Sequence, residues 1–328
     1  MSDVSAGQSS PDEAERRFVF RDGELRLQQG APDARRRLLV ADSWLVDHGR
    51  VRAIDLHRDR FVGSCLASGY SDRATLDAFW ASALGALPPV HRWFPRVELW
   101  ATPGGGPSAV SRPGRAASGD GTAGHGTAGD GTAGHGTAGH GTAGHGTAGD
   151  GTAGDGTAGG FELSVLVRLA PAPAGTAVLG THLGEEPRSI PSVKGPDLER
   201  LTTLRNAARE RGIDDLVILA GDAAIVDGTT TALLWWRGDE LHVPPAALAR
   251  VDSVTARTIR VLAQALGVPV VEERAAPTDL RGCEVWAVNA LYGIRSVTEW
   301  AGGPAVAADE ARAAQWQRRL GQLARPLA

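Results

Sequence analysis

Alternating apolar and polar residues near the start of the chain predict a β-hairpin. Residues 17–20 and 24–27 have the pattern of two short strands, and they flank Asp22-Gly23. This pair readily adopts the positive backbone angles of a two-residue hairpin loop. Other short apolar or alternating runs predict further strands, at residues 38–40, 44–46, 96–100, 161–169, 215–220, 224–226, 232–236, 268–272 and 285–289.

Residue spacings of three and four, together with start and stop signals, predict four helices among these strands. The first begins at Asp55, and the second follows Ser71-Asp72 with an apolar stripe that indicates a buried face. The third begins at Pro196-Asp197 and stops at Gly212, and the fourth spans residues 252–267. Strands and helices mixed in this order predict an α+β or mixed α/β fold.

A glycine-rich segment interrupts the first half of the chain. From Gly119 to Ala158 the unit Gly-(Asp or His)-Gly-Thr-Ala repeats eight times. Burial cannot offset the entropy of ordering so much glycine, so we expect a disordered, solvated insert and no metal site, with weak binding of a divalent metal as the alternative. The predicted organisation is a disordered leader at 1–15, a small domain at 16–179 with the insert at 103–160, a linker at 180–192 and a large domain at 193–328.

Composition narrows the classes of partner. The formal net charge of -4 gives no positive field to hold a nucleic-acid backbone, so we expect no nucleic-acid partner. No apolar run reaches the ~20 residues of a membrane helix, and the N-terminus lacks the apolar core of a signal peptide. We therefore expect no membrane association and a cytoplasmic location. Cys65 and Cys283 lack metal-ligand spacing and are expected to be buried free thiols.

Lys194 is the only lysine, since the other residues among the 34 Lys and Arg are all arginine. An arginine guanidinium stays protonated, whereas a lysine amine removed from water can lose its proton and attack a carbonyl carbon. Lys194 is therefore a candidate for covalent catalysis through a Schiff base. The alternative is that a coding bias toward arginine left one lysine by chance.

Five sequence blocks, in order, resemble the fold-type IV pyridoxal-phosphate enzymes, the class IV aminotransferase family. Lys194 precedes a leucine-rich helix and the block Gly212 to Leu219, and His57-x-x-Arg60 resembles the family's first-half helix start. The other blocks are Val226-Asp227-Gly228-Thr229-Thr230, Ser253-Val254-Thr255 and Asn289-Ala290-Leu291-Tyr292-Gly293-Ile294-Arg295. Apart from the leader and the insert, the resemblance covers most of the chain. It implies a two-domain fold of the D-amino-acid aminotransferase type, pyridoxal 5'-phosphate (PLP) as cofactor, and a homodimer.

The resemblance also implies roles for individual residues. Lys194 would hold the cofactor and shuttle a proton. Asp227 stands where the family usually has a glutamate beside the ring nitrogen; being one methylene shorter, it could reach that nitrogen directly, through water or not at all, and the alternative is an ordinary turn residue. Arg60, Val254 and Thr255 would bind the phosphate, because a cation and the amides at a helix start suit a dianion.

Each of these phosphate and substrate assignments has a structural alternative. Arg60 could be a solvated arginine on a helix face, and the 252–253 pair could serve only as a helix cap. Ala256 stands where the family often has arginine. Asn289 would lie over the cofactor or merely cap a strand end, and Arg295 would bind a substrate carboxylate or remain on the surface.

The Asn289-Ala290-Leu291 block most resembles the aminodeoxychorismate lyase branch of the family, and Glu199 replaces a tyrosine of the branched-chain aminotransferases. The resemblance thus implies a small-molecule amino substrate. Lys194 would remove its C4 proton, and pyruvate and 4-aminobenzoate would form, a step of folate biosynthesis. The alternative is a class IV aminotransferase acting on an amino acid and a 2-keto acid. A second alternative is a decayed enzyme scaffold used for binding.

Overall fold

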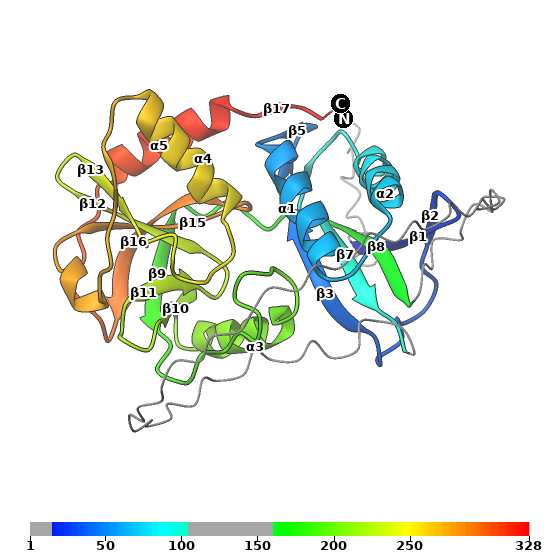
Figure 1. Ribbon diagram of the computed structural model, residues 1–328. Helices are drawn as coiled ribbons and strands as arrows, with labels where there is room; N and C mark the ends of the chain where they lie inside the picture. Colours follow the sequence, from blue (N-terminus) through cyan, green and yellow to red (C-terminus); the bar gives the residue numbers. More distant parts are fainter. Residues whose placement is uncertain (1–14, 104–159, 328) are drawn as a thin grey trace, which may run out of the picture. The chain divides into compact units, whose positions relative to one another are not determined.

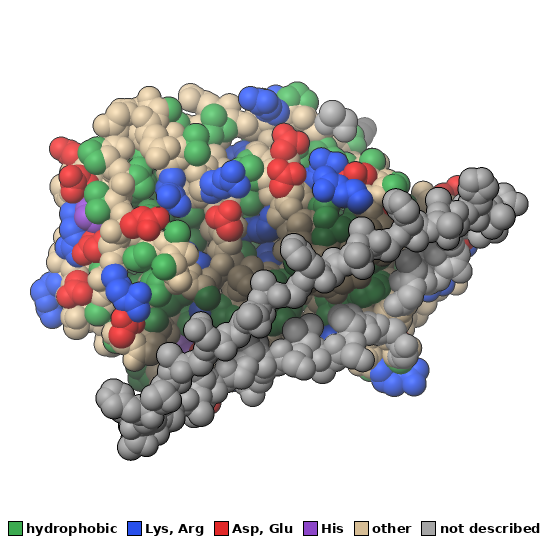
Figure 2. Space-filling view, in the orientation of Figure 1, with side chains coloured by type: hydrophobic (Ala, Val, Ile, Leu, Met, Phe, Trp, Pro, Cys, Tyr) green, Lys and Arg blue, Asp and Glu red, His purple; other side chains and the backbone are tan. Residues whose placement is uncertain are grey.

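The computed structural model describes residues 15–103 and 160–327. The predicted leader, the insert and any metal binding by its repeat fall almost entirely outside these residues. None of the described helices has the length and apolar character needed to cross a bilayer. On the face drawn in Figure 2, acidic and basic side chains are interspersed.

A five-stranded antiparallel sheet, in the order β2-β1-β8-β7-β3, forms the first part of the structure (Figure 1). The predicted hairpin is its β1–β2 pair, and Asp22 (φ 52°) and Gly23 (φ 79°) both adopt the expected positive angles. The strands are β1 (Glu15–Arg21), β2 (Glu24–Leu27), β3 (Arg37–Ser43), β7 (Arg96–Ala101) and β8 (Phe161–Arg168).

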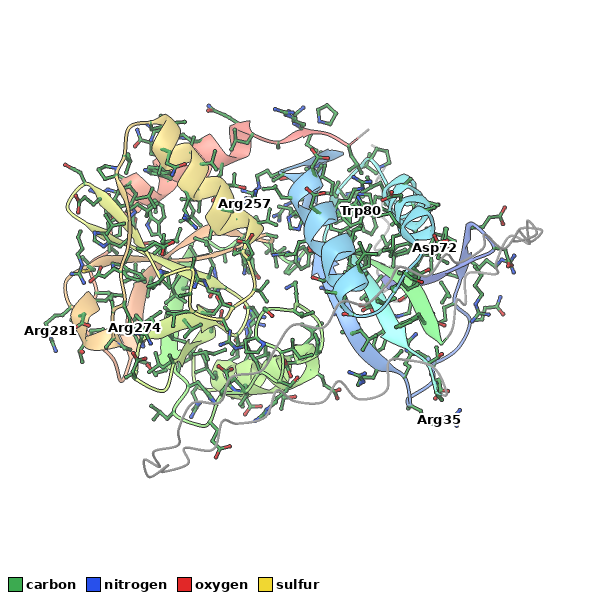
Figure 3. All side chains as sticks on the ribbon, in the orientation of Figure 1. Arg35, Asp72, Trp80, Arg257, Arg274 and Arg281 are labelled. Carbon is green, nitrogen blue, oxygen red and sulfur yellow. The ribbon has the colours of Figure 1, made fainter. Side chains whose placement is uncertain are left out.

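Helices α1 (Ile54–Ala67) and α2 (Arg73–Gly85) pack against this sheet. The Asp72 carboxylate caps α2 by accepting a hydrogen bond from the Thr75 amide at 3.0 Å, and Trp80 lies on the same helix (Figure 3). Its ring centroid is 6.0 Å from that of Phe61 on α1. The apolar stripe predicted for the second helix is therefore the contact surface between helices and sheet.

An eight-stranded mixed sheet, in the order β11-β10-β9-β16-β15-β12-β13-β14, forms the second part. Helices α4 (Val254–Ala265) and α5 (Glu310–Gln322) contribute to one apolar cluster with alternate strand residues, and α3 (Leu198–Arg209) packs on β10. The strands are β9 (Thr176–Thr181), β10 (Asp215–Leu219), β11 (Ile225–Gly228), β12 (Ala232–Arg237), β13 (Glu240–Val243), β14 (Val270–Glu272), β15 (Glu284–Asn289) and β16 (Gly293–Ala301).

A small third sheet joins the C-terminal end of the described chain to the first half. Its strand order is β17-β5-β4-β6, and Arg325 pairs with Val51. The remaining elements are β4 (Val46–Asp47), β5 (Arg50–Val51), β6 (Arg92–Trp93), β17 (Arg325–Pro326) and the 3-10 helix η2 (Pro277–Leu280).

The predicted mixed α/β fold class is confirmed, and so are the four predicted helices. The strand predicted at 44–46 is wrong, because only Val46 is in a strand. The elements that were not predicted include β9, β16 and α5, as well as the short β5, β6, β17 and η2. Strand β9 straddles the domain boundary predicted after residue 179 and lies in the eight-stranded sheet. The division into domains stays a prediction.

Candidate active site

A cavity of about 380 Å³ is lined by residues from both large sheets and from the segments that follow them. The predicted site residues that line it are Lys194, Arg60, Asp227, Val254, Thr255 and Asn289. These residues come from α1, the segment before α3, β11, the start of α4 and the end of β15. The fold thus gathers into one cavity side chains that are far apart in the sequence.

Lys194 belongs to a segment that docks directly on β3. Its carbonyl oxygen accepts a hydrogen bond from the Ala41 amide at 2.7 Å. Gly195 permits this approach, because its φ is 141° and a Cβ there would lie 2.7 Å from the Ala41 nitrogen. Burial, and then the positive charge of Arg60, lower the pKa of the Lys194 amine to about 8. A usable fraction of the amine is therefore neutral near physiological pH, as a nucleophile requires.

Arg60 is held in place by Asp42, a fully buried residue of β3. Nε and Nη2 of Arg60 each donate to the Asp42 carboxylate at 2.8 Å, and Nδ1 of His57 lies 2.8 Å from the same group. Although burial opposes ionisation, Arg60 and His57 hold the pKa of Asp42 well below its usual range. Nη1 of Arg60 donates to the carbonyl of Asp252 at 2.7 Å, just before α4. Arg60 is thus not a solvated helix-face arginine.

The start of α4 faces the cavity with free amide groups. Ser253 is its N-cap, and the Ser253 hydroxyl accepts a hydrogen bond from the Ala256 amide at 3.3 Å. The amides of Val254 and Thr255, in the first turn, have no acceptor inside the helix. The capping alternative is therefore correct for Ser253, and it leaves the first-turn amides available for an anion, so the phosphate site stays a prediction.

Asp227 is a buried carboxyl group without a hydrogen-bonding side chain among the described residues. Its nearest cation is Arg188, whose Nη1 lies 3.9 Å from Oδ2. Burial raises the pKa of Asp227 to about 7, and Arg188 and Arg250 oppose part of this rise. Among the described residues, the carboxyl group thus has no cation within hydrogen-bond distance.

Arg188, the nearest cation to Asp227, has one terminal nitrogen that its ion pair with Glu186 does not use. Its Nε and Nη2 donate to the Glu186 carboxylate at 2.7 and 2.8 Å, which fixes the guanidinium. Nη1 is buried and has no hydrogen-bond acceptor within the described part of the chain. Because an unpaired buried donor is costly, this nitrogen indicates that a ligand completes the site.

Asn289 shapes the turn at the end of β15. Its Oδ1 accepts a hydrogen bond from the Tyr292 amide at 2.9 Å, and its Nδ2 donates to the Thr230 carbonyl at 3.4 Å. The predicted strand-end cap is therefore present. Asn289 also lines the cavity, so the cap and a role toward a ligand are compatible.

The structure places Arg295 outside the cavity lining. Only 2% of its surface is exposed, and its guanidinium lies 4.9 Å from the centroid of the Tyr292 ring. The surface alternative is wrong, because Arg295 is buried, whereas a role toward a substrate carboxylate stays a prediction. The burial of Arg295 follows from the register of the sheet, in which Arg295 on β16 pairs with the buried Ala287 on β15.

The sequence analysis missed Asp42 and Arg188. Asp42 had a detectable signal, because it follows Leu38-Leu39-Val40 as a charge at the end of an apolar strand. Arg188 had none, since it lies in a proline-rich segment beside Glu186 and resembles a surface residue. Its burial depends on contacts with β11 that no local pattern encodes.

Residues 147–300 match the family model for amino-transferase class IV. This segment of the chain is thus similar to class IV aminotransferases. Enzymes of this class depend on PLP and act on small amino and keto compounds, so the predicted cofactor and the prediction of a PLP-dependent enzyme are confirmed. No curated protein sequence has a significant match to the chain.

Solved structures of similar fold cover the matched segment and extend beyond it. An aminotransferase from Brucella abortus bound to PLP has a TM-score of 0.64 and 14% identity, over 94% of this chain and 99% of its own. A branched-chain aminotransferase from the archaeon Thermoproteus uzoniensis has a TM-score of 0.63 and 14% identity, over 95% of this chain and 100% of its own. A Legionella pneumophila protein provisionally assigned as 4-amino-4-deoxychorismate lyase has a TM-score of 0.62 and 13% identity, over 87% of this chain and 90% of its own. At such low identity these similarities establish the fold, and the predicted fold-type IV architecture is confirmed.

Proposed function

We propose that the cavity binds PLP through Lys194 and processes the amino group of a small acidic substrate. The observation that carries this proposal is the shared cavity of four complementary groups. They are a lysine amine of lowered pKa, a buried carboxyl group, an arginine and a helix start, contributed by Lys194, Asp227, Arg60 and α4.

The residues present fit the cofactor. Arg60 and the amides of Val254 and Thr255 would hold the phosphate, and Asp227 would face the ring nitrogen. One feature supports the fit: Nη1 of Arg188 and Oδ2 of Asp227 lie 3.9 Å apart, too far for a hydrogen bond, so each could accept a further partner. A protonated ring nitrogen and an oxygen acceptor are the kinds of atom that would satisfy them.

Bound PLP would supply an aldehyde for the substrate amine and a ring that accepts electrons from a neighbouring bond. Nζ of Lys194 would carry the proton, because its lowered pKa lets it accept and return a proton near neutral pH. Asp227 would hold negative charge opposite the ring nitrogen. Asp42 would keep Arg60 aimed at the start of α4, since the carboxylate that forms both prongs of the ion pair is fully buried.

We propose an aminodeoxychorismate lyase type of reaction as the first candidate. Its support is the Asn289-Ala290-Leu291 segment, which lines the cavity. A class IV aminotransferase is the second candidate, supported by the family model and by the aminotransferases of similar fold. Lys194 would serve both reactions, because it removes a proton in each and the reactions differ only in where that proton returns. The cytoplasmic location, the homodimer and a place in folate biosynthesis stay predictions.

Borohydride reduction followed by peptide mapping tests the cofactor assignment. PLP added to the purified protein should give visible absorption and a reduced adduct on Lys194, which is the only side-chain amine in the chain. Lys194→Ala should lose the adduct, and Arg200→Ala, an exposed control on α3, should keep it. A wild-type protein that takes up no PLP would support the decayed-scaffold alternative instead.

Product analysis separates the two reactions. The lyase candidate requires release of pyruvate and 4-aminobenzoate from aminodeoxychorismate without an added keto acid. Conversion of an amino acid only when a 2-keto acid is supplied would favour the aminotransferase.

A further inference from the structure

Asp197 lies directly before α3 but does not cap that helix. Aspartate at such a position usually accepts hydrogen bonds from the free amides of the first helical turn. In α3, however, no such bond forms with the Asp197 side chain. The carboxylate instead contacts the chain eight residues earlier, on the other side of Lys194. Asp197 thus has a structural role beyond starting the helix.

Three hydrogen bonds join the Asp197 carboxylate to Ser189 and Ile190. Oδ2 accepts from the Ser189 amide at 2.9 Å and from the Ile190 amide at 3.3 Å, and Oδ1 accepts from the Ser189 hydroxyl at 2.7 Å. Hydrogen bonds to an ionised acceptor are about twice as strong as those between neutral groups. The carboxylate therefore closes residues 189–197 into a loop, which we call the lysine loop.

Lys194 lies within the lysine loop and depends on it for its position. Inside the loop, the Val193 amide donates to the Ile190 carbonyl at 3.0 Å, which forms a turn just before Lys194. The Lys194 carbonyl docks on β3 through the Ala41 amide at 2.7 Å. Asp197 joins the two ends of the loop, so it restricts how far Lys194 can move from β3.

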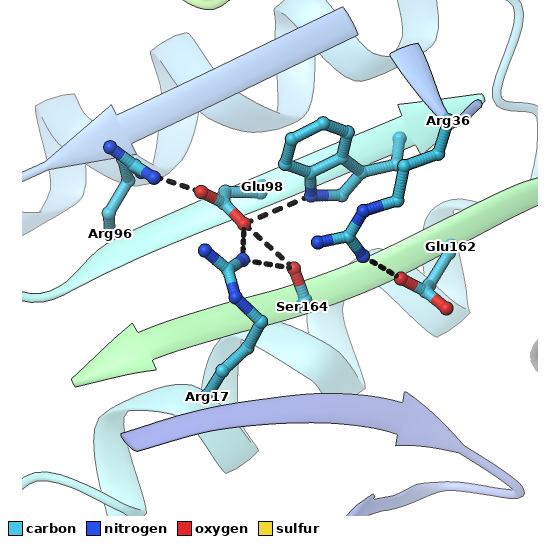
Figure 4. Close-up of polar contacts among 7 residues, drawn as sticks. Arg17, Arg36, Arg96, Glu98, Glu162 and Ser164 are labelled. Atoms are coloured by element: carbon cyan, nitrogen blue, oxygen red, sulfur yellow. Dashed lines mark hydrogen bonds and ion pairs between the residues drawn. The ribbon is translucent and has the colours of Figure 1, made fainter. Parts of the chain in front are cut away.

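The charges that act on the Lys194 amine lie outside the lysine loop. Burial contributes most to its lowered pKa, and the largest charge effects come from four side chains on α1, β3, β7 and β11: Arg60, Asp42, Arg96 and Asp227. Arg96 is itself fixed, because its Nε donates to the fully buried Glu98 carboxylate at 2.6 Å (Figure 4). Loss of the Asp197 contact would leave these charges in place, so the pKa of Lys194 reports whether the amine stays in its desolvated position.

We propose that Asp197 is a positioning residue that keeps the Lys194 amine in its desolvated position by closing the lysine loop. The inference rests on the proposed function, because the neutral amine in that position is the one that would capture PLP. Without the carboxylate, the amides of residues 189–190 lose this acceptor and turn to solvent, so the loop opens and water reaches the amine. A solvated amine keeps its proton to a higher pH, which lowers its neutral fraction near pH 7.

Nuclear magnetic resonance tests this role directly, because Lys194 is the only lysine. Protein grown with carbon-13-labelled lysine gives one Cε signal, and its chemical shift against pH gives the pKa of the amine without any cofactor. The wild-type midpoint should be about 8. Asp197→Ala should raise the midpoint by about one pH unit, toward the ordinary value of 10.5, and slow the capture of PLP near pH 7 about tenfold.

Two further variants complete the test. Ser189→Ala removes one of the three hydrogen bonds and no charge, so its midpoint should rise in the same direction by a smaller amount. Glu199→Gln is the matched control, because Glu199 is an exposed acidic residue on α3 that does not line the cavity. It should keep both the midpoint and the capture rate of the wild type.

Thermal unfolding of each variant reports whether it is folded, and Ser189→Ala decides the outcome if Asp197→Ala does not fold. Unshifted midpoints in the folded variants of Asp197 and Ser189 would overturn the positioning role, whether or not PLP capture is slowed. Shifted midpoints in a protein whose wild type takes up no PLP would refute the proposed function and leave the role of Asp197 standing.

Discussion

Asp42 and Arg60 form a two-pronged ion pair, with Oδ2 2.8 Å from Nε and Oδ1 2.8 Å from Nη2. The pair joins β3 to α1, and the remaining Arg60 nitrogen reaches the residue before the cap of α4. The position of the predicted phosphate ligand is therefore set by a carboxylate that would not itself touch the phosphate. Breaking a buried pair leaves one charge uncompensated, which costs more than the pair contributes as a unit.

Asp42→Asn should lower the free energy of unfolding by about 3–5 kcal/mol and weaken PLP binding at least about tenfold. Denaturant unfolding and a PLP titration measure the two effects. Asp77→Asn removes the partly exposed partner of Arg58 and should cost no more than about 1 kcal/mol. Similar behaviour of the two variants would show that Asp42 does not position Arg60.

The rate of covalent capture of PLP by Lys194 should rise with pH and level off above about 8. The pKa of this amine is lowered, so the neutral, attacking form predominates at a pH where an ordinary lysine is still charged. Stopped-flow absorbance at a series of pH values gives the midpoint. A midpoint near the ordinary lysine value would contradict the described environment of Lys194.

Asp227 should make the cofactor-free protein less stable as the pH rises. Its pKa is raised to about 7, so between its ordinary value of 3.8 and 7 the folded state binds more proton than the unfolded state. Stability from this group is therefore full at low pH and is lost as the pH rises to about 7, by on the order of 2–4 kcal/mol.

The measurement is urea unfolding from pH 4 to 8 for the wild type and Asp227→Asn. The difference in unfolding free energy between the two proteins should change over this interval, because the amide does not titrate. Asp239→Asn, at an exposed position, serves as the control and should follow the wild type. A constant difference between wild type and Asp227→Asn would be inconsistent with a raised pKa.

Gly195→Ala should displace Lys194 from its position. The added Cβ would lie 2.7 to 2.8 Å from backbone atoms of Val40 and Ala41, and the φ of 141° is unfavourable for alanine. We expect a loss of more than about 2 kcal/mol in stability and slower covalent capture of PLP. Gly212→Ala is the control, because Gly212 also has a positive φ but no atom near the added Cβ, so it should cost about 1 kcal/mol and leave capture unchanged.

Local sequence patterns were sufficient to predict features that depend on a single turn or a single helix. The β1–β2 hairpin followed from Asp22-Gly23, and the cap of α2 followed from Asp72, because turn angles and capping bonds depend on residues adjacent in sequence. By contrast, β9 and β16 escaped detection. They pair with each other, and their contacts span more than a hundred residues.

The sequence by itself determined that Lys194 is the only side chain able to offer a primary amine, and it indicated that Arg60, Asp227 and the start of α4 belong to one kind of chemistry. Only the tertiary structure decided which charges meet. It paired Arg60 with Asp42, left Nη1 of Arg188 unpaired near Asp227, and enclosed Arg295 beneath Tyr292. The physical reason is that pKa values and ion pairs depend on burial and on distances across strands, which sheet register and segment docking set. Periodicity along the chain fixes only which face of its own element a residue occupies.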